Sequence, residues 1–406
     1  MCIFAGSGGT GILNKKGSTL VEIVIKAGKE KAIRQGHPWI FTGAIADIKG
    51  AAQSGDQCIV QSIKGETLGF GYYNAQSAIA VRLLSFGSKK FDSSLLEKRI
   101  YDALQLRKFD NSTTDSYRLI NSEGDFLPGL IVDKFGDGIV IQVLTSGMER
   151  IRNEIIGYLT AICKPSFIYE RSDTESRKRE GLDESDGLIS GRIPESVIVK
   201  ENGMKFSVDI CSGQKTGFFF DQRTNRLLIR DYAANKTMCD CFSYSGAFTV
   251  NAFAAGVKSS ECVDISKNAV EQVKKNVGLN FQSAHLSTVN ADVFKYLRET
   301  TSLYDLIVLD PPKFAKHPGE VERASRGYKD INLVAMKKIA PEGIIFTFSC
   351  SNAIDPKLFR QIVFAAAADS GRSVQVLHSM TAGVDHPVNI AHKEGEYLKG
   401  LVLRVF

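Results

Sequence analysis

Short alternations of apolar and polar residues fill the chain after residue 19. The runs VEIVI, QCIVQSI, LGFGYY and AIAVRLL are separated by Gly, Asp and Asn. Alternation with a period of two is typical of half-buried β-strands, and Gly and Asn mark turns. We therefore predict a small barrel-like β-domain over residues 20–90. Residues 1–19 show no period, so we predict a flexible N-terminal arm there.

Helical and strand-like periods are mixed over residues 91–200, which indicates a different kind of domain. The predicted helices are residues 93–109 and 148–163, and the predicted strands are residues 118–133, 138–144 and 167–170. A charged segment that contains glycine continues from there to Arg192. This mixture of elements predicts a central α+β domain.

Apolar strand-like runs alternate regularly with helical runs over residues 201–406. The strand-like runs include MCDCF, SSECVD, LSTVNAD, YDLIVLD and GIIFTFSCS, with helical runs such as KNAVEQVKKNVGLN between them. This alternation predicts a parallel sheet with helices on both faces. The predicted fold class is therefore multidomain α/β, with a β-barrel, a central α+β domain and a C-terminal Rossmann-like domain.

Composition excludes some classes of protein. At 406 residues with 43% hydrophobic content, the chain can build several cores. No apolar run approaches the roughly 20 residues of a membrane helix, and the first ten residues lack the basic region of a secretory signal. We expect no membrane association and a cytoplasmic location. The net charge of +6 is compatible with a polyanionic partner but does not identify one.

The eight cysteines are scattered along the chain. They have neither the paired CxxC spacing of zinc sites nor the density of a disulfide framework, so we expect no metal site. Each cysteine must be judged by its own surroundings. Cys239 and Cys241 flank Asp240 in one apolar run, and we interpret them as strand residues.

One glycine and three acids end successive predicted strands of the C-terminal domain. Gly246 closes the turn after the first strand, and Asp264, Asp292 and Asp310 end the next three. Ligands of doubly wound sheets bind at the carboxyl ends of the strands. Gly246 would let the backbone approach a ligand, Asp264 could accept ribose hydroxyls, and Asp292 could accept from an amine. The alternatives are a structural turn at Gly246 and helix N-caps at Asp264 and Asp292.

Four short motifs carry a resemblance to class I S-adenosylmethionine methyltransferases. DCFSYSGAF, VDIS, NADVF and DPPKF look like motifs I to IV of that class, and the GxGxxG fingerprint of nicotinamide dehydrogenases is missing. TGFFFDQRTNR, at 216–226, resembles the segment that lies along the cofactor in related RNA methyltransferases. The resemblance implies S-adenosylmethionine as the cofactor and a mixed seven-stranded sheet. The residues it assigns to the cofactor are Phe219, Asp221, Arg223, Asn225, Phe242, Ser243, Tyr244, Gly246, Asp264, Asp292 and Asp310.

An alternative exists for the segment 216–226. It could be a strand and helix start packed on the sheet, with Asp221 as the helix N-cap.

DPPKF, at 310–314, and Cys350 indicate the chemistry. Two prolines after Asp310 fix a rigid turn that can clamp a flat base. Cys350 follows the strand-like run GIIFTF, so we expect it on the same edge of the sheet. Cytosine C5 is a poor nucleophile, and a thiolate that adds at C6 activates it. We predict Cys350, Asp310 and Lys313 as catalytic residues. The alternative for Cys350 is a plain core cysteine.

The whole pattern resembles the bacterial 23S rRNA cytosine-5 methyltransferases that carry an N-terminal PUA domain. RGYKDIN at 326–332 and DHPV with EGEYLKG at 385–400 contribute to it. The resemblance implies a PUA-like, RNA-binding domain over residues 20–90 and a methyltransferase domain over 201–406. It also implies large-subunit rRNA as partner and 5-methylcytosine as product. A homodimer is compatible with the pattern.

Two details of this family resemblance concern the catalytic domain. In the family, a final hairpin adds an antiparallel strand beside the fifth strand, which matches EYLKGLVLRVF. Motif IV has no cysteine here, so a different base must remove the C5 proton.

Residues for RNA binding follow from the same resemblance. HPWIF at 37–41 resembles the start of the PUA fold, and YERSD at 169–173 resembles a segment that faces the substrate. The residues assigned to RNA are Arg34, His37, Trp39, Arg171, Ser172, Lys313 and Phe314. A solvated charged loop is the alternative for YERSD. For Trp39 we favour a place in the core.

Two rival functions stay open at this point. DPPKF by itself could support methylation at a base nitrogen. A noncatalytic RNA-binding factor in ribosome assembly, with a cofactor pocket kept for stability, is the second rival.

Overall fold

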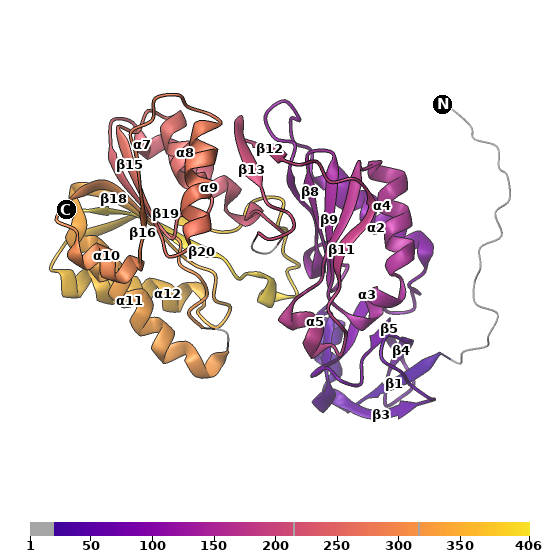
Figure 1. Ribbon diagram of the computed structural model, residues 1–406. Helices are drawn as coiled ribbons and strands as arrows, with labels where there is room; N and C mark the ends of the chain where they lie inside the picture. Colours follow the sequence, from indigo (N-terminus) through magenta and orange to yellow (C-terminus); the bar gives the residue numbers. More distant parts are fainter. Residues whose placement is uncertain (1–19, 214–215, 316) are drawn as a thin grey trace. The chain divides into compact units, whose positions relative to one another are not determined.

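The computed structural model describes residues 20–213, 216–315 and 317–406. The described residues divide into two compact units, with the boundary between Phe91 and Asp92, and Figure 1 draws both in sequence colours. The predicted arm, residues 1–19, lies outside the described residues. None of the described helices is both long and apolar enough to cross a membrane.

The first unit is built on a six-stranded sheet with the order β2-β6-β5-β4-β1-β3. Its elements are β1 (Val21–Ile25), α1 (Glu30–Arg34), β2 (Trp39–Phe41), β3 (Ile45–Lys49), β4 (Gln57–Ser62), β5 (Thr67–Tyr73) and β6 (Ile79–Phe86). The four predicted runs form β1, β4, β5 and β6, whereas β2 and β3 were not predicted. A Cβ on Gly71 would lie 2.2 Å from the Arg82 carbonyl oxygen, so the close approach of β5 to β6 requires glycine.

The second unit begins with a five-stranded sheet in the order β11-β10-β9-β8-β7. Its strands are β7 (Tyr117–Asn121), β8 (Leu130–Phe135), β9 (Gly138–Val143), β10 (Phe167–Arg171) and β11 (Asp186–Gly191). Its helices are α2 (Ser93–Leu106), α3 (Ser146–Arg150), α4 (Arg152–Cys163) and α5 (Glu175–Arg179). The predicted strand 118–133 is therefore two strands, and the predicted helix 148–163 begins within α3. The hairpin of β12 (Val197–Glu201) and β13 (Met204–Val208) spans the predicted domain boundary at 200/201.

A mixed seven-stranded sheet forms the C-terminal part, in the order β16-β15-β14-β17-β18-β20-β19. Its strands are β14 (Thr237–Cys241), β15 (Ser259–Asp264), β16 (Leu286–Asn290), β17 (Tyr304–Leu309), β18 (Ile339–Ser349), β19 (Val374–Met380) and β20 (Lys399–Val405). The first five strands are parallel, and β20 is antiparallel to both β18 and β19. The predicted final antiparallel strand is confirmed, while β19 and the helix α12 were not predicted.

Helices cover both faces of this sheet (Figure 1). One face packs on α6 (Arg223–Leu228), α7 (Arg230–Ala233), α8 (Ala247–Ala254) and α9 (Lys267–Gly278). The other face packs on α10 (Val293–Glu299), α11 (Val321–Lys338) and α12 (Pro356–Ser370). Cys262 and Val263 of β15 show the alternation, because they belong to the two opposite cores.

The central sheet and the seven-stranded sheet share one hydrophobic core. Phe135 and Phe167 of the central sheet cluster with Phe206, Phe218 and Phe220. The rings of Phe135 and Phe220 lie 5.2 Å apart. This common core explains why residues 92–406 form a single unit rather than two.

Candidate active site

Four predicted residues gather at one edge of the seven-stranded sheet, as the strand order confirms. Asp264 ends β15, and Gly246, Asp292 and Asp310 follow β14, β16 and β17. These four strands are parallel neighbours, so their carboxyl ends meet at one edge. Cys350 follows β18, which pairs with β17 in parallel. It therefore lies on the same edge, as predicted.

The turn after β14 holds an unusual backbone conformation. Phe242, Tyr244 and Gly246 have φ angles of 60°, 45° and 72°. For the two aromatic residues such angles are strained, and strain of this kind concentrates at functional sites. A Cβ on Gly246 would also lie 2.9 Å from a methyl group of Val273, so close packing on α9 requires glycine. Within the described part of the chain, the buried Ser243 hydroxyl has no hydrogen-bond partner.

Asp264 and Asp292 differ in what their carboxylates bind. Asp264 accepts from the Tyr244 backbone N–H at 3.0 Å and from Ser266 N–H at 2.9 Å. The N-cap of α9 is Ser266, so the cap alternative for Asp264 is wrong. Asp292 is the N-cap of α10 and accepts from Lys295 N–H at 2.9 Å. The cap alternative for Asp292 is confirmed, although its exposed carboxylate keeps further acceptor sites.

The first half of the segment 216–226 lies along the turn after β14. The Tyr244 hydroxyl donates to the Gly217 carbonyl at 3.1 Å. The Phe219 ring meets the Tyr244 ring edge-on at 5.1 Å. Asp221 accepts from the hydroxyl of Tyr397 at 2.6 Å and is a residue of the 3-10 turn before α6, not the helix N-cap. Phe219 thus lies beside the turn after β14, whereas the buried Asp221 is bonded to Tyr397.

The polar side chains in the second half of this segment form hydrogen bonds and ion pairs with other buried residues of the protein. The Arg223 guanidinium donates to the Ser116 carbonyl at 2.7 Å and pairs with Asp385 at 3.2 Å. It also lies over the Phe109 ring at 4.4 Å. Asn225 donates to Gln222 and to a backbone carbonyl. Both residues are 3% exposed, and their bonds favour the alternative of packing over contact with the methionine end.

Cys350 lies against the DPPKF turn. Its sulfur is 3.8 Å from the Pro311 carbonyl oxygen, and its side chain is partly exposed. The neighbouring Ser351 hydroxyl accepts from Ala315 N–H at 3.3 Å, which ties the loop after β18 to the end of DPPKF. The Asp310 N–H donates to the Cys241 carbonyl at 3.5 Å and so anchors the start of the turn. Cys350 thus packs at the border of a hydrophobic cluster, with part of its surface exposed beside the turn.

Two residues of EGEYLKG belong to this site and were missed as individual residues. The Lys313 ammonium lies 5.8 Å from the centre of the Tyr397 ring, and burial raises the pKa of the Tyr397 hydroxyl. Lys399 is buried, and that burial lowers its pKa to about 8. The signal in the sequence was the position of both residues at the start of the last predicted strand. That strand lies beside the strand that ends before Cys350.

Three residues predicted to bind RNA in the second unit have internal partners. Arg171 donates to the carbonyls of Ile210 and Gly213. Ser172 is fully buried, and its hydroxyl donates to Glu170 and accepts from Val143 N–H. Phe314 stacks on Tyr328 with a 4.6 Å separation of ring centres. These contacts favour a structural role, whereas Lys313 is exposed.

The predicted RNA residues of the first unit lie at or near its surface. Arg34 is exposed and forms a double hydrogen bond with Glu66. Trp39 is half-buried rather than a full core residue, and its ring meets those of His37 and Phe41 edge-on at 6.1 and 6.4 Å. Phe41 is 49% exposed. The prediction that Trp39 lies in the core is therefore only partly correct, because its side chain is half-buried.

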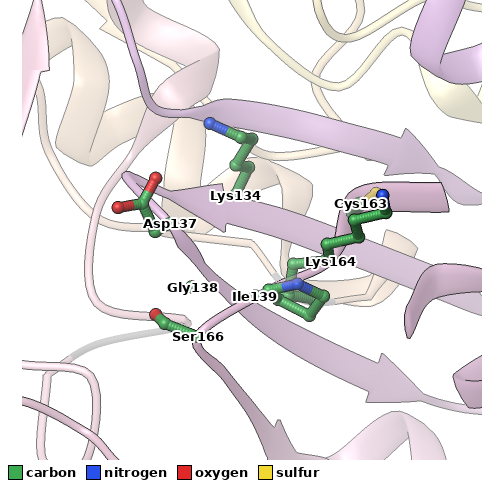
Figure 2. Close-up of a pocket in the computed structure, with 8 residues that line it drawn as sticks. Lys134, Asp137, Gly138, Ile139, Cys163, Lys164 and Ser166 are labelled. Carbon is green, nitrogen blue, oxygen red and sulfur yellow. The ribbon is translucent and has the colours of Figure 1, made fainter. Parts of the chain in front are cut away.

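No group of three potential metal-ligating side chains occurs among the described residues. A cavity of about 260 Å³ lies in the central α+β region (Figure 2). Its lining includes Lys134, Asp137, Cys163 and Lys164, and none of its residues is a predicted site residue. The Lys134 ammonium there donates to the Asp115 carbonyl at 2.9 Å. The cavity is thus separate in its residues from the edge that carries Cys350.

The edge fits S-adenosylmethionine by the chemistry of its donors and acceptors. The buried Ser243 hydroxyl can bond a ligand, and the carboxylates of Asp264 and Asp292 can accept from hydroxyl and amino groups. The fold and this edge define a class I S-adenosylmethionine-dependent methyltransferase. In agreement, the family of S-adenosylmethionine-dependent methyltransferases matches residues 174–390, and a PUA-like domain matches residues 23–86.

The particular family follows from similar proteins. The chain is 39% identical over 391 residues to ribosomal RNA large subunit methyltransferase I of Alteromonas mediterranea, covering 95% of this chain and 98% of that protein. It is 40% identical over 392 residues to the protein of that name from Pseudoalteromonas translucida, covering 95% and 99%. The chain belongs to the family of ribosomal RNA large subunit methyltransferase I.

A solved structure has the same overall fold. It is a candidate S-adenosylmethionine-dependent methyltransferase from Streptococcus mutans, with a TM-score of 0.81 and 23% identity, and the match covers 95% of this chain and 100% of that one. A further solved structure, of a candidate methyltransferase in complex with S-adenosylhomocysteine, has a TM-score of 0.83 at 23% identity.

Proposed function

We propose that this methyltransferase forms 5-methylcytosine in large-subunit ribosomal RNA, with Cys350 as the nucleophile. The observation that carries the proposal is the contact between Cys350 and the DPPKF turn, with the sulfur 3.8 Å from the Pro311 carbonyl oxygen. A thiol beside a turn suited to a flat base is the arrangement that activation of cytosine needs. The ribosomal substrate is supported by the names of relatives that are about 40% identical over 95% of the chain.

The chemistry assigns a task to each residue at the turn. The Cys350 thiolate forms a bond to C6 of the base, and the C5=C6 double bond opens so that C5 becomes nucleophilic. S-adenosylmethionine supplies the methyl group. A base then takes the proton from C5, the double bond forms again, and the sulfur leaves C6 as a thiolate. Asp310 and Lys313 hold the ring during these steps.

Phe219, Asp221, Ser243 and Asp264 are the residues that we assign to the cofactor. The ring of Phe219 contacts that of Tyr244 in the turn after β14, and Asp221 lies two residues further along the same segment, where Tyr397 donates to it. Two backbone N–H groups donate to the Asp264 carboxylate, and its remaining acceptor sites bind the ribose hydroxyls. Asp292 accepts a hydrogen bond from the adenine amino group and also caps α10.

RNA contacts are assigned mainly to the PUA-like domain and to Lys313. The rings of His37, Trp39 and Phe41 contact one another in sequence, and the exposed Arg34 precedes them in the chain with Glu66 as its partner. Aromatic rings stack on unpaired bases, and arginine binds phosphate. The target cytosine must leave its stack to reach Cys350.

Replacing Cys350 with alanine tests the proposal. The purified full chain is incubated with labelled S-adenosylmethionine and protein-free ribosomal RNA, and the product is mapped by mass spectrometry. We expect 5-methylcytosine from the parent protein and a rate lower by about 10⁴-fold or more in Cys350→Ala. Cys211→Ala is the matched control, because Cys211 is an exposed thiol outside the site. Full activity of Cys350→Ala would instead support methylation at nitrogen.

A second experiment detects the covalent step directly. RNA that carries 5-fluorocytidine at the target has no C5 proton to lose, so the sulfur–C6 bond persists after methyl transfer. We expect this RNA to be attached to the peptide that contains Cys350. Absence of label on every ribosomal RNA tried, and of any adduct, would favour a noncatalytic assembly factor.

A further inference from the structure

Lys399 lies closer to the chemistry than its place in a terminal strand suggests. It begins β20 and pairs with Ser349, the last residue of β18, so it stands opposite the strand end from which Cys350 emerges. Its side chain is buried, with 5% of the residue exposed. A lysine is rarely buried without partners, because removing an ammonium from water is costly.

The partners of Lys399 are two backbone carbonyls at this strand end. Its ammonium donates to the Ser351 carbonyl at 2.6 Å and to the Tyr397 carbonyl at 2.8 Å. An ammonium has three donors, and these two bonds use two of them. Ser351 is next to Cys350, and its hydroxyl accepts from Ala315 N–H. Lys399 thus holds the same short loop that Ala315, the residue after the DPPKF turn, also contacts.

The charges around Lys399 also connect it to the thiol. Burial lowers the pKa of Lys399, the Coulombic effect of Cys350 raises it, and smaller effects of Lys313 and Asp355 lower and raise it; the resulting pKa is about 8. A Coulombic effect between two groups acts in both directions. A charged Lys399 therefore favours the thiolate of Cys350.

We propose that Lys399 is the positioning residue of the active site: it fixes the Cys350–Ser351 loop through the Ser351 carbonyl and stabilises the Cys350 thiolate by its charge. This inference rests on the proposed role of Cys350 as nucleophile. Lys313 is not equivalent, because it is exposed and lies over the Tyr397 ring. Lys399 is the buried ammonium that binds the backbone next to Cys350.

The other titratable groups around the thiol do not supply a buried positive charge. Tyr328 and Tyr397 interact electrostatically with Cys350, and burial raises the pKa of both hydroxyls. They are neutral at pH 7 and change little across the range in which a thiol titrates. Asp310 and Asp355 are acids and favour the thiol form. Removal of Lys399 therefore leaves Lys313 as the cation in this group of residues.

The test measures the reactivity of the thiol in the absence of RNA. The rate of alkylation of Cys350 by iodoacetamide is followed from pH 5 to 10 in the full chain, with the peptide of Cys350 quantified by mass spectrometry. In Lys399→Met we expect the midpoint of the profile to rise by about one pH unit, with a rate roughly tenfold lower at pH 6–7. The difference should shrink above pH 8, where Lys399 loses its proton. Lys399→Arg, which keeps the charge, should restore most of the profile.

Lys338→Met is the matched control. Lys338 is also partly buried and donates to a backbone carbonyl, that of Thr300, but it precedes β18 at the opposite end of the strand from Cys350. Its alkylation profile should equal that of the parent protein. Binding of S-adenosylmethionine verifies that each variant is folded.

The outcomes separate this inference from the proposed function. An unchanged alkylation profile in folded Lys399→Met would overturn the role of Lys399, whatever Cys350 does. A shifted profile together with full methyl transfer by Cys350→Ala would keep the electrostatic effect and overturn the nucleophile. A shifted profile with a loss of 5-methylcytosine in both variants supports both. If Lys399→Met fails to bind the cofactor, Lys399→Arg decides: a parent-like profile supports the inference, and a profile shifted by a unit contradicts it.

Discussion

The polar residues that motifs assign to the site lie in two regions, which differ in how far their side chains are buried and bonded to other parts of the protein. At the sheet edge, Asp264, Asp310 and Cys350 are partly exposed. At the junction with the central sheet, Arg223 and Arg171 are buried and bind carbonyls and carboxylates of other elements. Residues that motifs assign to a ligand can therefore be bonded to other parts of the protein instead. Burial together with existing side-chain partners identifies such residues.

Replacing Arg223 should produce the largest effect on stability. We expect Arg223→Met to lower the free energy of unfolding by about 3–5 kcal/mol, because the buried carboxylates of Asp385 and Glu201 would each lose one cationic partner. Urea unfolding measures this, with Arg298→Met as control, since the Arg298 pair with Asp330 is exposed and worth about 1 kcal/mol or less. If Arg223→Met is nearly as stable as the parent protein but binds S-adenosylmethionine more weakly, Arg223 contacts the cofactor rather than stabilising the junction.

Acid should weaken the junction through Asp385. Burial raises the pKa of this carboxyl, but the hydrogen bond and charge of His386 and the charge of Arg223 lower it more, to about 2. Its stabilisation is complete above pH 4 and is lost as the pH falls through about 2, a change of about 2 kcal/mol. The unfolding free energy of Asp385→Asn should fall less over this range. Parallel curves for the two proteins would contradict the assignment.

Asp264 should matter for the cofactor more than for stability. We expect Asp264→Ala to weaken binding of S-adenosylmethionine by about 10- to 30-fold, as the loss of charge-assisted hydrogen bonds to ribose predicts. Isothermal titration calorimetry gives the affinity, and thermal unfolding gives the stability. An unchanged affinity would leave Asp264 with only its bonds to Tyr244 and Ser266.

Asp292 should show the smallest effect of the series. Its carboxylate caps α10, so Asp292→Ala should cost about 1 kcal/mol of stability. Asp292→Ser, which can cap the helix without a charge, should recover the stability. If Asp292→Ser recovers the stability but still binds S-adenosylmethionine weakly, Asp292 contacts adenine. If both the stability and the affinity recover, Asp292 acts only as the N-cap of α10.

Much of the architecture could be predicted from periodicity. Alternating strands and helices indicated the sheet of β14 to β18, and strand ends located Gly246, Asp264, Asp292 and Asp310. The strands β2, β3 and β19 were missed, and all three lie at the outer edges of their sheets. β3 and β19 are exposed along most of their length, so they carry little alternation of apolar and polar residues. The helix α12 and the split of residues 146–163 into α3 and α4 were also missed. The predicted boundary at 200/201 falls inside β12 of the hairpin β12–β13, and residues on both sides of it belong to one unit.

The sequence by itself determined the class of the C-terminal domain, its cofactor and the edge of the sheet that carries Cys350. The edge of the sheet follows from local patterns, because strand ends and turns are encoded by residues close together in the chain, whereas the class and the cofactor were implied by the resemblance of four motifs to known methyltransferases. The tertiary structure decided the roles of side chains that meet from distant segments. Arg223 meets Asp385 across 162 positions, and Lys399 meets Ser351 across 48. Such pairs form only once the strands have taken their order in the sheet, so the local pattern of apolar and polar residues does not predict them.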